Sequence, residues 1–326
     1  MSEPMLQVSD QKVHFKIPGE GFFFPKKQIL RAVDGISFSL YKGETLGVVG
    51  ESGCGKSTLA RGILGLEKIT AGSVKLNGEE LTTLDKNDMR EKRRVMQVVF
   101  QDPLASLNPR MTVGEIIAEP LRVFEPAMDA GRRKKQVQEV MQRVGLLPNL
   151  INRYPHEFSG GQCQRIGIAR ALIVKPQLLI CDEPVSALDV SIQAQIINLL
   201  MELQEEMGLT MIFIAHDLSV VKHISHKVMV MYLGKVVEMA SKQEIYANPR
   251  HPYTKALIEA IPIPDPAIER GKNKKILDGD LPSPLDPPSG CAFRTRCDLA
   301  QEKCAQQAPQ LDAENDQHRV ACWFPI

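Results

Sequence analysis

The sequence predicts an α/β fold that contains a parallel β-sheet, and three observations predict it. Thr45–Val49 is a short apolar run of the buried-strand type, and a glycine-rich loop and a helix follow it. Residues 178–181 and Thr210–Ala215 have the same strand character. A helix with one apolar face, at about 192–207, separates these two runs. Strand, helix and strand in this order favour parallel pairing.

The elements expected around this core differ in kind. Residues 33–40 alternate as a strand should, and a turn at 41–44 leads into the first buried strand. From about 101 to 174, long charged segments with helical periodicity appear, such as 131–144. Further along, seven prolines lie between residues 262 and 288, which favours extended, irregular backbone.

The composition narrows the class of protein. The chain has 326 residues, 43% of them hydrophobic, and 40 Lys and Arg against 39 Asp and Glu, a formal charge of +1. This balance argues against a duplex-DNA binder with a large basic surface, so no nucleic-acid partner is expected. No stretch approaches the roughly 18 apolar residues of a spanning helix, and the first residues lack the pattern of a secretory signal. We therefore expect a cytosolic chain that reaches a membrane only through partners.

Residues 50–57 form the strongest motif of the chain. They fit the pattern G-x-x-x-x-G-K-[ST] between a predicted strand and a helix expected from Thr58 onward, the context that supports a phosphate-binding loop. Glycines let backbone N–H groups turn toward an anion, Lys56 supplies positive charge for the β- and γ-phosphates, and the Ser57 hydroxyl can ligate Mg²⁺. The alternative is a glycine-rich turn with a surface lysine. The nucleotide-binding residues expected here are Gly50, Glu51, Ser52, Gly53, Cys54, Gly55, Lys56, Ser57 and Thr58.

Two carboxylates end the next predicted core strand. Asp182 and Glu183 follow the apolar residues 178–181, and a buried parallel strand would place them beside the phosphate loop. Asp182 would hold Mg²⁺ through water, and Glu183 would orient and polarise the attacking water. The alternative is a strand end with two solvated acids. Together with the loop, the pair predicts a nucleotide-hydrolysing site.

Further motifs carry a resemblance to a known family. Phe-Ser-Gly-Gly-Gln at 158–162 resembles the signature of ATP-binding-cassette ATPases, although the first position usually holds Leu in that family. Ser-Ala-Leu-Asp at 186–189 resembles the family's D-loop, His216 its switch histidine and Gln101 its Q-loop glutamine. The motifs stand in the family's order and cover residues 1 to about 245.

The resemblance implies a more detailed fold and domain division. The expected fold is a P-loop NTPase (RecA-like) ATP-binding cassette with an antiparallel β subdomain, an α-helical signature subdomain and a small cysteine-containing C-terminal extension. The core with its β subdomain would comprise 1–100 and 175–247. The helical subdomain would comprise 101–174, and the extension 248–326.

The resemblance also implies a role for each motif. Catalysis would rest on Glu183, His216 and Gln101, and Mg²⁺ would be held by Ser57, Gln101 and Asp182. For the histidine and the glutamine, a structural histidine and an ordinary polar strand end are the alternatives. The signature would cover the ATP held by an opposite subunit, so that two ATPs lie between two cassettes. The nucleotide-contacting residues implied in this way are Ser159, Gly160, Gly161, Gln162 and Asp189.

An aromatic residue after the first strand stacks on adenine in this family. Phe15 fits that place by spacing, and any aromatic face can stack on a base. The competing run at 22–24 consists of three Phe residues and is better explained as an apolar loop packed on the sheet.

Two stretches narrow the match to peptide importers. Residues 101–110 and 251–254 resemble that branch, and 144–167 resembles the ATPase of oligopeptide permeases, with the dipeptide-permease ATPase as the nearest alternative. The branch implies an ATPase at the cytoplasmic side of the bacterial inner membrane. Its partners would be a second, different cassette in a heterodimer, two transmembrane permeases and, indirectly, an extracytoplasmic peptide-binding protein. A soluble cassette ATPase is disfavoured because the sequence has no heptad run and no second cassette. A regulatory module that only senses ATP is disfavoured by Glu183 and His216.

Four of the seven cysteines lie in the last 36 residues, with the spacing C-x5-C-x6-C-x17-C. Without a C-x-x-C pair a zinc ribbon is less favoured, whereas four thiolates at wide spacing can hold a [4Fe–4S] cluster. The resemblance also favours iron–sulfur, and zinc or free structural thiols are the alternatives. The expected ligands are Cys291, Cys297, Cys304 and Cys322.

Overall fold

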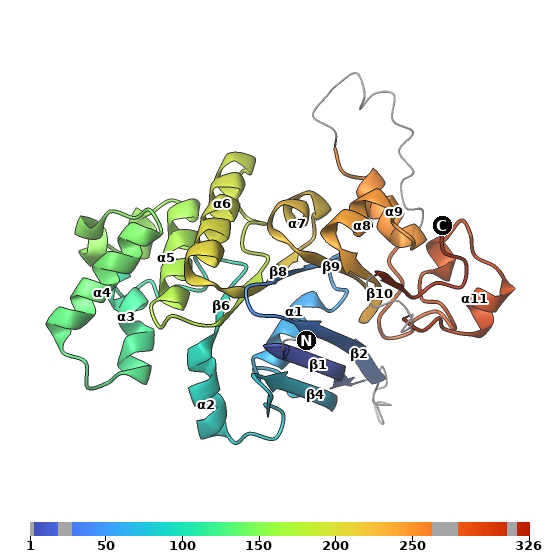
Figure 1. Cartoon of the computed structure of the whole chain (residues 1–326), viewed down its shortest axis with the longest axis horizontal. Helices are drawn as coiled ribbons and strands as arrows, with labels where there is room; N and C mark the ends of the chain where they lie inside the picture. The colour runs from blue at the N-terminus through green and yellow to red at the C-terminus, as the bar shows by residue number, and fades with distance from the viewer. Residues whose placement is uncertain (1–2, 19–27, 263–279, 312–317) are drawn as a thin grey trace. The chain divides into compact units, whose positions relative to one another are not determined.

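A computed structural model describes residues 3–18, 28–262, 280–311 and 318–326 of the chain (Figure 1). Contacts within the chain divide it into two compact units. The first unit comprises Leu40–Thr45 and Thr83–Ala215. The second unit comprises Glu3–Ser39, Leu46–Thr82 and His216–Ile326. The domain boundaries expected from the sequence remain a prediction.

The first unit contains three parallel strands, β6 (Met96–Val99), β7 (Leu178–Asp182) and β8 (Thr210–Ala215). β6 pairs with β7, and β7 pairs with β8, both in parallel. Every residue of β7 and β8 is buried, as expected for parallel strands covered on both faces. The parallel pairing predicted from the order of strand and helix is confirmed.

Helices make up most of the rest of the first unit. They are α2 (Lys86–Val95), α3 (Val113–Phe124), α4 (Ala130–Arg143), α5 (Gly160–Leu172) and α6 (Val190–Met207), with short 3-10 helices η1 (Pro148–Asn152) and η2 (Pro155–Glu157). Helix α3 packs on both α4 and α5 (Figure 1). Most of α5 is buried, including Ile166, Ile168 and Leu172. This burial explains why α5 lacks the amphipathic pattern of a surface helix.

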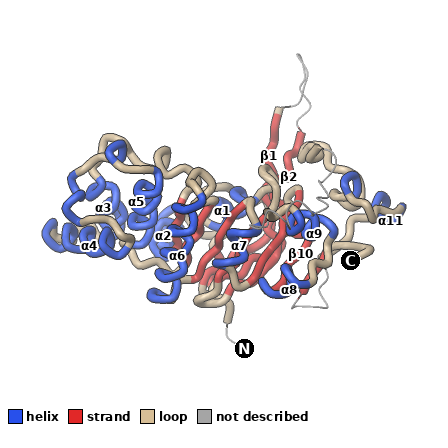
Figure 2. Tube along the Cα trace, turned by 90° about the horizontal axis from the view of Figure 1, so that it is seen from above, coloured by secondary structure: helices blue, strands red, loops and turns tan. Residues whose placement is uncertain are grey.

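The second unit contains an antiparallel sheet with the strand order β2-β1-β4-β5. These strands are β1 (Leu6–Ile17), β2 (Gln28–Leu40), β4 (Ala71–Leu76) and β5 (Glu79–Glu80). β4 runs antiparallel to both β1 and β5, and Figure 2 shows β1 and β2 side by side. This sheet is the antiparallel part expected from the sequence.

A second set of strands supports the glycine-rich loop and the C-terminal extension. They are β3 (Thr45–Val49), β9 (Lys227–Tyr232), β10 (Lys235–Ser241) and β11 (His318–Val320). β3 pairs in parallel with β9, whereas β10 runs antiparallel to β9 and to β11. The last strand therefore attaches the extension to the edge of β10.

The helices in the described part of the second unit are short. They are α1 (Lys56–Ile63), α7 (Leu218–Ile224), α8 (Lys242–Ala247), α9 (Pro252–Glu259), η3 (Arg294–Arg296) and α11 (Glu302–Gln306). An aromatic cluster joins β9, α9 and the residues just before η3. The ring centroids of Tyr232 and Tyr253 lie 4.9 Å apart, and Phe293 lies 5.3 Å from each. None of the described helices combines the length and the apolar character of a membrane span.

Candidate active site

The glycine-rich loop joins β3 to α1, as the sequence predicts, although α1 begins at Lys56 rather than at Thr58. Gly50 and Gly55 have φ angles of 157° and 103°. A Cβ at Gly50 would lie 2.2 Å from the carbonyl oxygen of Met231, and one at Gly55 would lie 2.0 Å from that of Ala32. Both glycines are therefore required because the loop packs directly on neighbouring backbone.

Lys56 points into this loop and is almost fully buried, with 4% of the residue exposed. Its Nζ donates hydrogen bonds to the carbonyl oxygens of Gly50, at 2.8 Å, and of Glu51, at 3.0 Å. The alternative of a surface lysine on a glycine-rich turn is excluded by this burial. Burial also raises the pKa of the Cys54 thiol, so this side chain stays neutral and serves to pack the loop.

Glu51 is held by residues from outside the loop. Its backbone N–H donates a hydrogen bond of 3.0 Å to the Tyr253 hydroxyl. Its carboxylate accepts two hydrogen bonds from the Arg296 guanidinium, at 2.7 and 3.0 Å. These bonds raise the pKa of Arg296 above its ordinary value. The sequence identified Tyr253 only as part of a branch-specific stretch and gave no signal for Arg296.

The carboxylate pair stands at the end of a buried strand, as predicted, and its place relative to the glycine-rich loop remains a prediction. Asp182 ends β7 and is 6% exposed. The next residue, Glu183, has a φ of 47°, and its N–H donates to the carbonyl oxygen of Ile214 at 3.1 Å. The Gln101 side-chain amide donates a hydrogen bond of 3.0 Å to the Glu183 carboxylate. The first unit therefore brings together two of the three residues proposed for catalysis.

The third, His216, belongs to the second unit, as does the glycine-rich loop. It follows the last residue of β8 directly and is exposed.

The signature motif forms the N-terminus of α5. Ser159 is the N-cap, and its Oγ accepts the N–H of Gln162 while the Gln162 side chain accepts the N–H of Ser159. Gln162 thus uses its side-chain oxygen to cap its own helix. Ser159 and Gly160 are exposed. Gly161 is buried, and a Cβ there would lie 2.5 Å from Ile192.

The D-loop motif connects the carboxylate pair to α6. The Ser186 hydroxyl donates to the carbonyl oxygen of Glu183 at 3.1 Å. Asp189 is the N-cap of α6 and accepts the N–H of Ile192 at 3.0 Å. This backbone hydrogen bond lowers the pKa of the exposed Asp189 carboxyl. Both motif residues therefore have structural partners within the first unit.

Of the two candidates for the residue that stacks on adenine, the structure describes one. Phe15 lies in β1 and is half-buried. The competing residues 22–24 lie outside the described part of the chain.

The iron–sulfur expectation finds no support in the geometry of the thiols. Among the described residues, no group of three or more His, Cys, Asp or Glu side chains is arranged to hold a metal ion. Cys291 and Cys304 are joined through the backbone, with an N–H to carbonyl distance of 2.7 Å. Burial raises the pKa of Cys322 to about 11, and the nearby Cys291, Cys297 and Cys304 add to that rise. Cys291, Cys297 and Cys304 therefore lie near Cys322, but the four described thiols are not arranged as the ligands of a metal ion.

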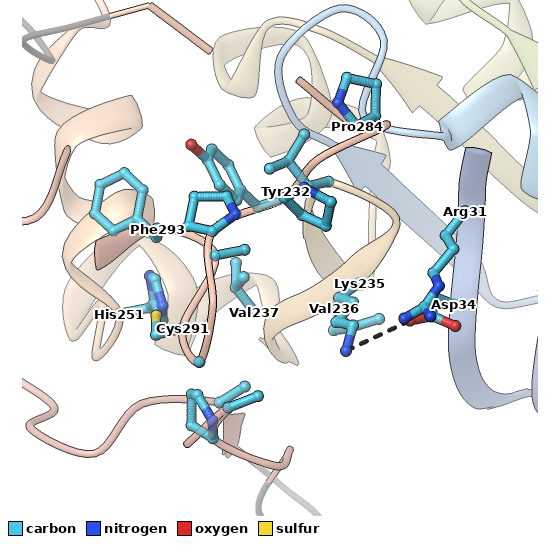
Figure 3. Close-up of a pocket in the computed structure, with 18 residues that line it drawn as sticks. Arg31, Asp34, Tyr232, Lys235, Val236, Val237, His251, Pro284, Cys291 and Phe293 are labelled. Carbon is cyan, nitrogen blue, oxygen red and sulfur yellow. Dashed lines mark ion pairs between the residues drawn. The ribbon is translucent and has the colours of Figure 1, made fainter. Parts of the chain in front are cut away.

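A cavity of about 290 Å³ lies in the second unit (Figure 3). Its walls include Tyr232, His251, Cys291 and Phe293, and an ion pair of 3.5 Å between Lys235 and Asp34 lies beside it. None of the residues expected to contact nucleotide lines this cavity. It is therefore distinct from the candidate nucleotide site.

Comparisons with known proteins show the family. Residues 33–186 match the family described as ABC transporter, and 237–304 match the C-terminal region of oligopeptide/dipeptide transporters. The chain is 61% identical over 321 residues to the oligopeptide transport ATP-binding protein OppF of Haemophilus influenzae, covering 98% of this chain and 97% of the relative. It is 60% identical over 319 residues to OppF of Escherichia coli, covering 98% and 95%.

A solved structure gives the same answer for the fold. The ATP-binding cassette MJ0796, in a dimeric post-hydrolysis state bound to ADP and Pi, is 30% identical with a TM-score of 0.65. The match covers 73% of this chain and 99% of the cassette. The chain belongs to the ABC transporter ATP-binding proteins. Within them it falls among the oligopeptide transport ATP-binding proteins, as the sequence motifs predict.

Proposed function

We propose that this chain is the ATP-hydrolysing subunit of an ABC transporter that imports oligopeptides. The observation that carries the proposal is the identity of 61% to an oligopeptide transport ATP-binding protein across 98% of the chain. The buried Lys56 within its strand, loop and helix supports the nucleotide site. A dipeptide importer is the second candidate, because the C-terminal family description covers both substrates.

ATP with Mg²⁺ is the nucleotide proposed for the loop. Backbone N–H groups and Lys56 would bind the phosphates, and Ser57, Asp182 and Gln101 would hold the metal ion. Bound Mg²⁺ would neutralise charge on the β- and γ-phosphates. Glu183 would polarise the attacking water while Gln101 orients its carboxylate, and His216 would donate a hydrogen bond to the γ-phosphate.

The partners follow from the same proposal. The exposed Ser159 and Gly160 at the start of α5 would cover ATP on a second cassette, and a different cassette would complete a heterodimer. Two transmembrane permeases would anchor the pair at the cytoplasmic side of the inner membrane, and a peptide-binding protein would supply substrate from outside. Purification from detergent-solubilised membranes should recover two permeases and a second cassette; recovery of the chain alone argues against this assembly.

Lys56→Ala tests the nucleotide site. Removing the ammonium group should reduce ATP binding below detection, because no other side chain of the loop carries positive charge. Binding of ATP with Mg²⁺ is measured by isothermal titration calorimetry on the full chain. Lys42→Ala, in the exposed turn before β3, is the control and should bind ATP like the unmodified chain. Equal affinity in the Lys56 variant would refute the assignment.

For the C-terminal extension we propose a [4Fe–4S] cluster held by the four cysteines. The proposal is supported by the number and spacing of the cysteines and by the proximity of Cys291, Cys297 and Cys304 to Cys322. Iron, sulfide and zinc content after anaerobic purification tests it. About four iron atoms per chain are expected, whereas zinc or no metal would overturn it.

A further inference from the structure

Arg296 of the C-terminal extension reaches the glycine-rich loop of the nucleotide site. It lies on η3, 245 residues after Glu51, and its two terminal nitrogens bind the two carboxylate oxygens of Glu51. The Arg296 side chain is 6% exposed and that of Glu51 is 29% exposed. A paired-nitrogen contact of this kind fixes orientation as well as distance, and at this degree of burial it is only weakly screened.

The loop is also held from α9. The Tyr253 hydroxyl accepts the N–H of Glu51, and the Tyr253 ring is fixed by the aromatic cluster with Tyr232 and Phe293. Phe293 precedes η3 directly, so the same cluster sets the position of the helix that carries Arg296. Side chain and backbone of Glu51 are thus both held by the region that matches the oligopeptide/dipeptide transporter C-terminal family.

The position of Glu51 bears directly on Lys56. The Glu51 carbonyl oxygen accepts one of the hydrogen bonds by which Lys56 is held inside the loop, and it also accepts the N–H of Cys54. A rotation of the Glu51 peptide would therefore move the carbonyl oxygen that holds the Nζ of Lys56 in position. The contacts run without a gap from Arg296 through Glu51 to Lys56.

We propose that Arg296 is a positioning residue for the phosphate loop, through which the C-terminal extension sets the affinity of the cassette for ATP. The inference rests on the proposed nucleotide site and gives the extension a task in the ATPase cycle. Tyr253 assists by holding the Glu51 backbone. Arg296 acts through Glu51 and does not itself contact the nucleotide.

A double-mutant cycle on Arg296 and Glu51 tests the proposal. The variants are Arg296→Gln, Glu51→Gln and the two combined, in the full chain assembled with its transporter partners. Each single variant should raise the KM for ATP about 10- to 100-fold. The reason is that a displacement of the loop by a fraction of an ångström misplaces its N–H groups and Lys56 relative to the phosphates. The kcat at saturating ATP should stay within about twofold, because Gln101 and Glu183 keep their contact. The double variant should be no worse than the poorer single variant.

Matched variants distinguish a loss of loop positioning from a general loss of stability. Arg294→Gln removes the other arginine of η3, which bonds to Ser289 at the surface, and should leave the KM unchanged. Arg296→Lys retains the charge without the paired nitrogens and should give an intermediate KM. Thermal unfolding without nucleotide identifies any variant that fails to fold. If Arg296→Gln fails to fold, the KM values of Arg296→Lys and Glu51→Gln test the proposal instead.

Two results would overturn the proposal. One is an Arg296→Gln or Arg296→Lys variant with an unchanged KM for ATP. The other is a double variant whose KM is the product of the two single effects, since independent residues multiply. If Lys56→Ala abolishes ATP binding while the Arg296 variants behave like the unmodified chain, the nucleotide site stands and only the role of the extension fails.

Discussion

Glu183 combines a left-handed backbone conformation with a hydrogen bond from Gln101. A non-glycine residue at a φ of 47° is uncommon and costs of the order of 1 kcal/mol or more, so surrounding contacts must hold it. The N–H of Glu183 bonded to Ile214 and the carbonyl oxygen bonded to Ser186 supply such contacts. The carboxylate is therefore directed by the backbone as well as by Gln101.

Glu183→Gln should abolish ATP turnover and preserve ATP binding. The amide keeps the size of the side chain but cannot polarise water as a carboxylate does. With ATP and Mg²⁺, the variant should accumulate as a closed cassette dimer, measured by size-exclusion chromatography alongside phosphate release. Glu202→Gln, on the exposed face of α6, is the control and should hydrolyse ATP normally. Substantial phosphate release by the Glu183 variant would exclude it as the base.

At the residue scale, short local patterns located the side chains proposed for the nucleotide site, whose roles remain predictions. Lys56 is buried in its loop, and Gln101 and Glu183 meet, although 82 residues separate them. Arg296 could not be predicted, because nothing in its neighbourhood marks it and its partner lies 245 residues away. Its contact depends on how the extension folds back onto the loop, which no short pattern records.

At the scale of the element, α5 shows how one serine can have two tasks. Ser159 caps the helix together with Gln162, and in the proposed dimer the same residue would contact ATP. Helix α3 has an equivalent cap, in which Thr112 and Glu115 form the reciprocal hydrogen bonds. The two helices therefore allow capping to be separated from nucleotide contact.

Ser159→Ala and Thr112→Ala should lower the free energy of unfolding by similar amounts, about 1 kcal/mol each. Only Ser159→Ala should also reduce the ATPase rate of the assembled transporter, because only that hydroxyl is proposed to meet ATP. Urea unfolding and phosphate release measure the two effects. If both variants lose activity equally, Ser159 acts only as a helix cap.

Element types were predictable from periodicity, whereas their ends depended on backbone conformation. The helix expected from Thr58 begins at Lys56, because Gly55 in the left-handed region ends the loop two residues earlier. The strand expected at 33–40 extends back to Gln28. Hydrophobic periodicity reports neither end, because it records which side chains are buried and not the backbone conformation at which an element begins.

At the scale of the molecule, α9 and the extension depend on a buried neutral histidine. His251 caps α9 by accepting the N–H of Tyr253 on Nδ1, at 3.1 Å. Burial lowers its pKa to about 3. Its backbone N–H donates to Glu238, which also accepts from Arg250 and contacts His318 of β11. The neutral imidazole thus lies where α9, β10 and β11 meet.

Stability of the second unit should therefore fall as the pH falls below about 6.5. The unfolded chain then binds a proton at residue 251 that the native chain excludes down to about pH 3. The free energy of unfolding should decrease by about 1.4 kcal/mol per pH unit in that window from this group. Urea unfolding followed by the fluorescence of Trp323, the single tryptophan, measures it between pH 4.5 and 7.

His251→Asn provides the comparison, since asparagine caps helices well and does not titrate. The pH dependence of its unfolding should be shallower than that of the unmodified chain by that slope. Parallel curves for the two proteins would mean that His251 is protonated without cost in the native state.

The class of fold was predictable from a few motifs, and the folding of the extension was not. The succession of strand, helix and strand, the loop and the signature each have a short pattern with a physical cause. β11 has only three residues, and the cysteine spacing that indicates a metal centre does not determine how the four thiols are arranged in space. Where contacting residues are far apart in sequence and few in number, tertiary packing determines the structure, and no short sequence pattern predicts that packing.

The pairing of β10 with β11 has a consequence for biosynthesis. Glu238 and His318, which meet in this pair, are 80 residues apart, so β10 is translated long before the strand that covers it. During that interval its N–H and C=O groups form an open β edge, to which another nascent chain can add. Ribosomes that stall or terminate before residue 318 would release chains in which the edge of β10 stays unpaired. Such fragments should appear in inclusion bodies rather than in assembled transporters.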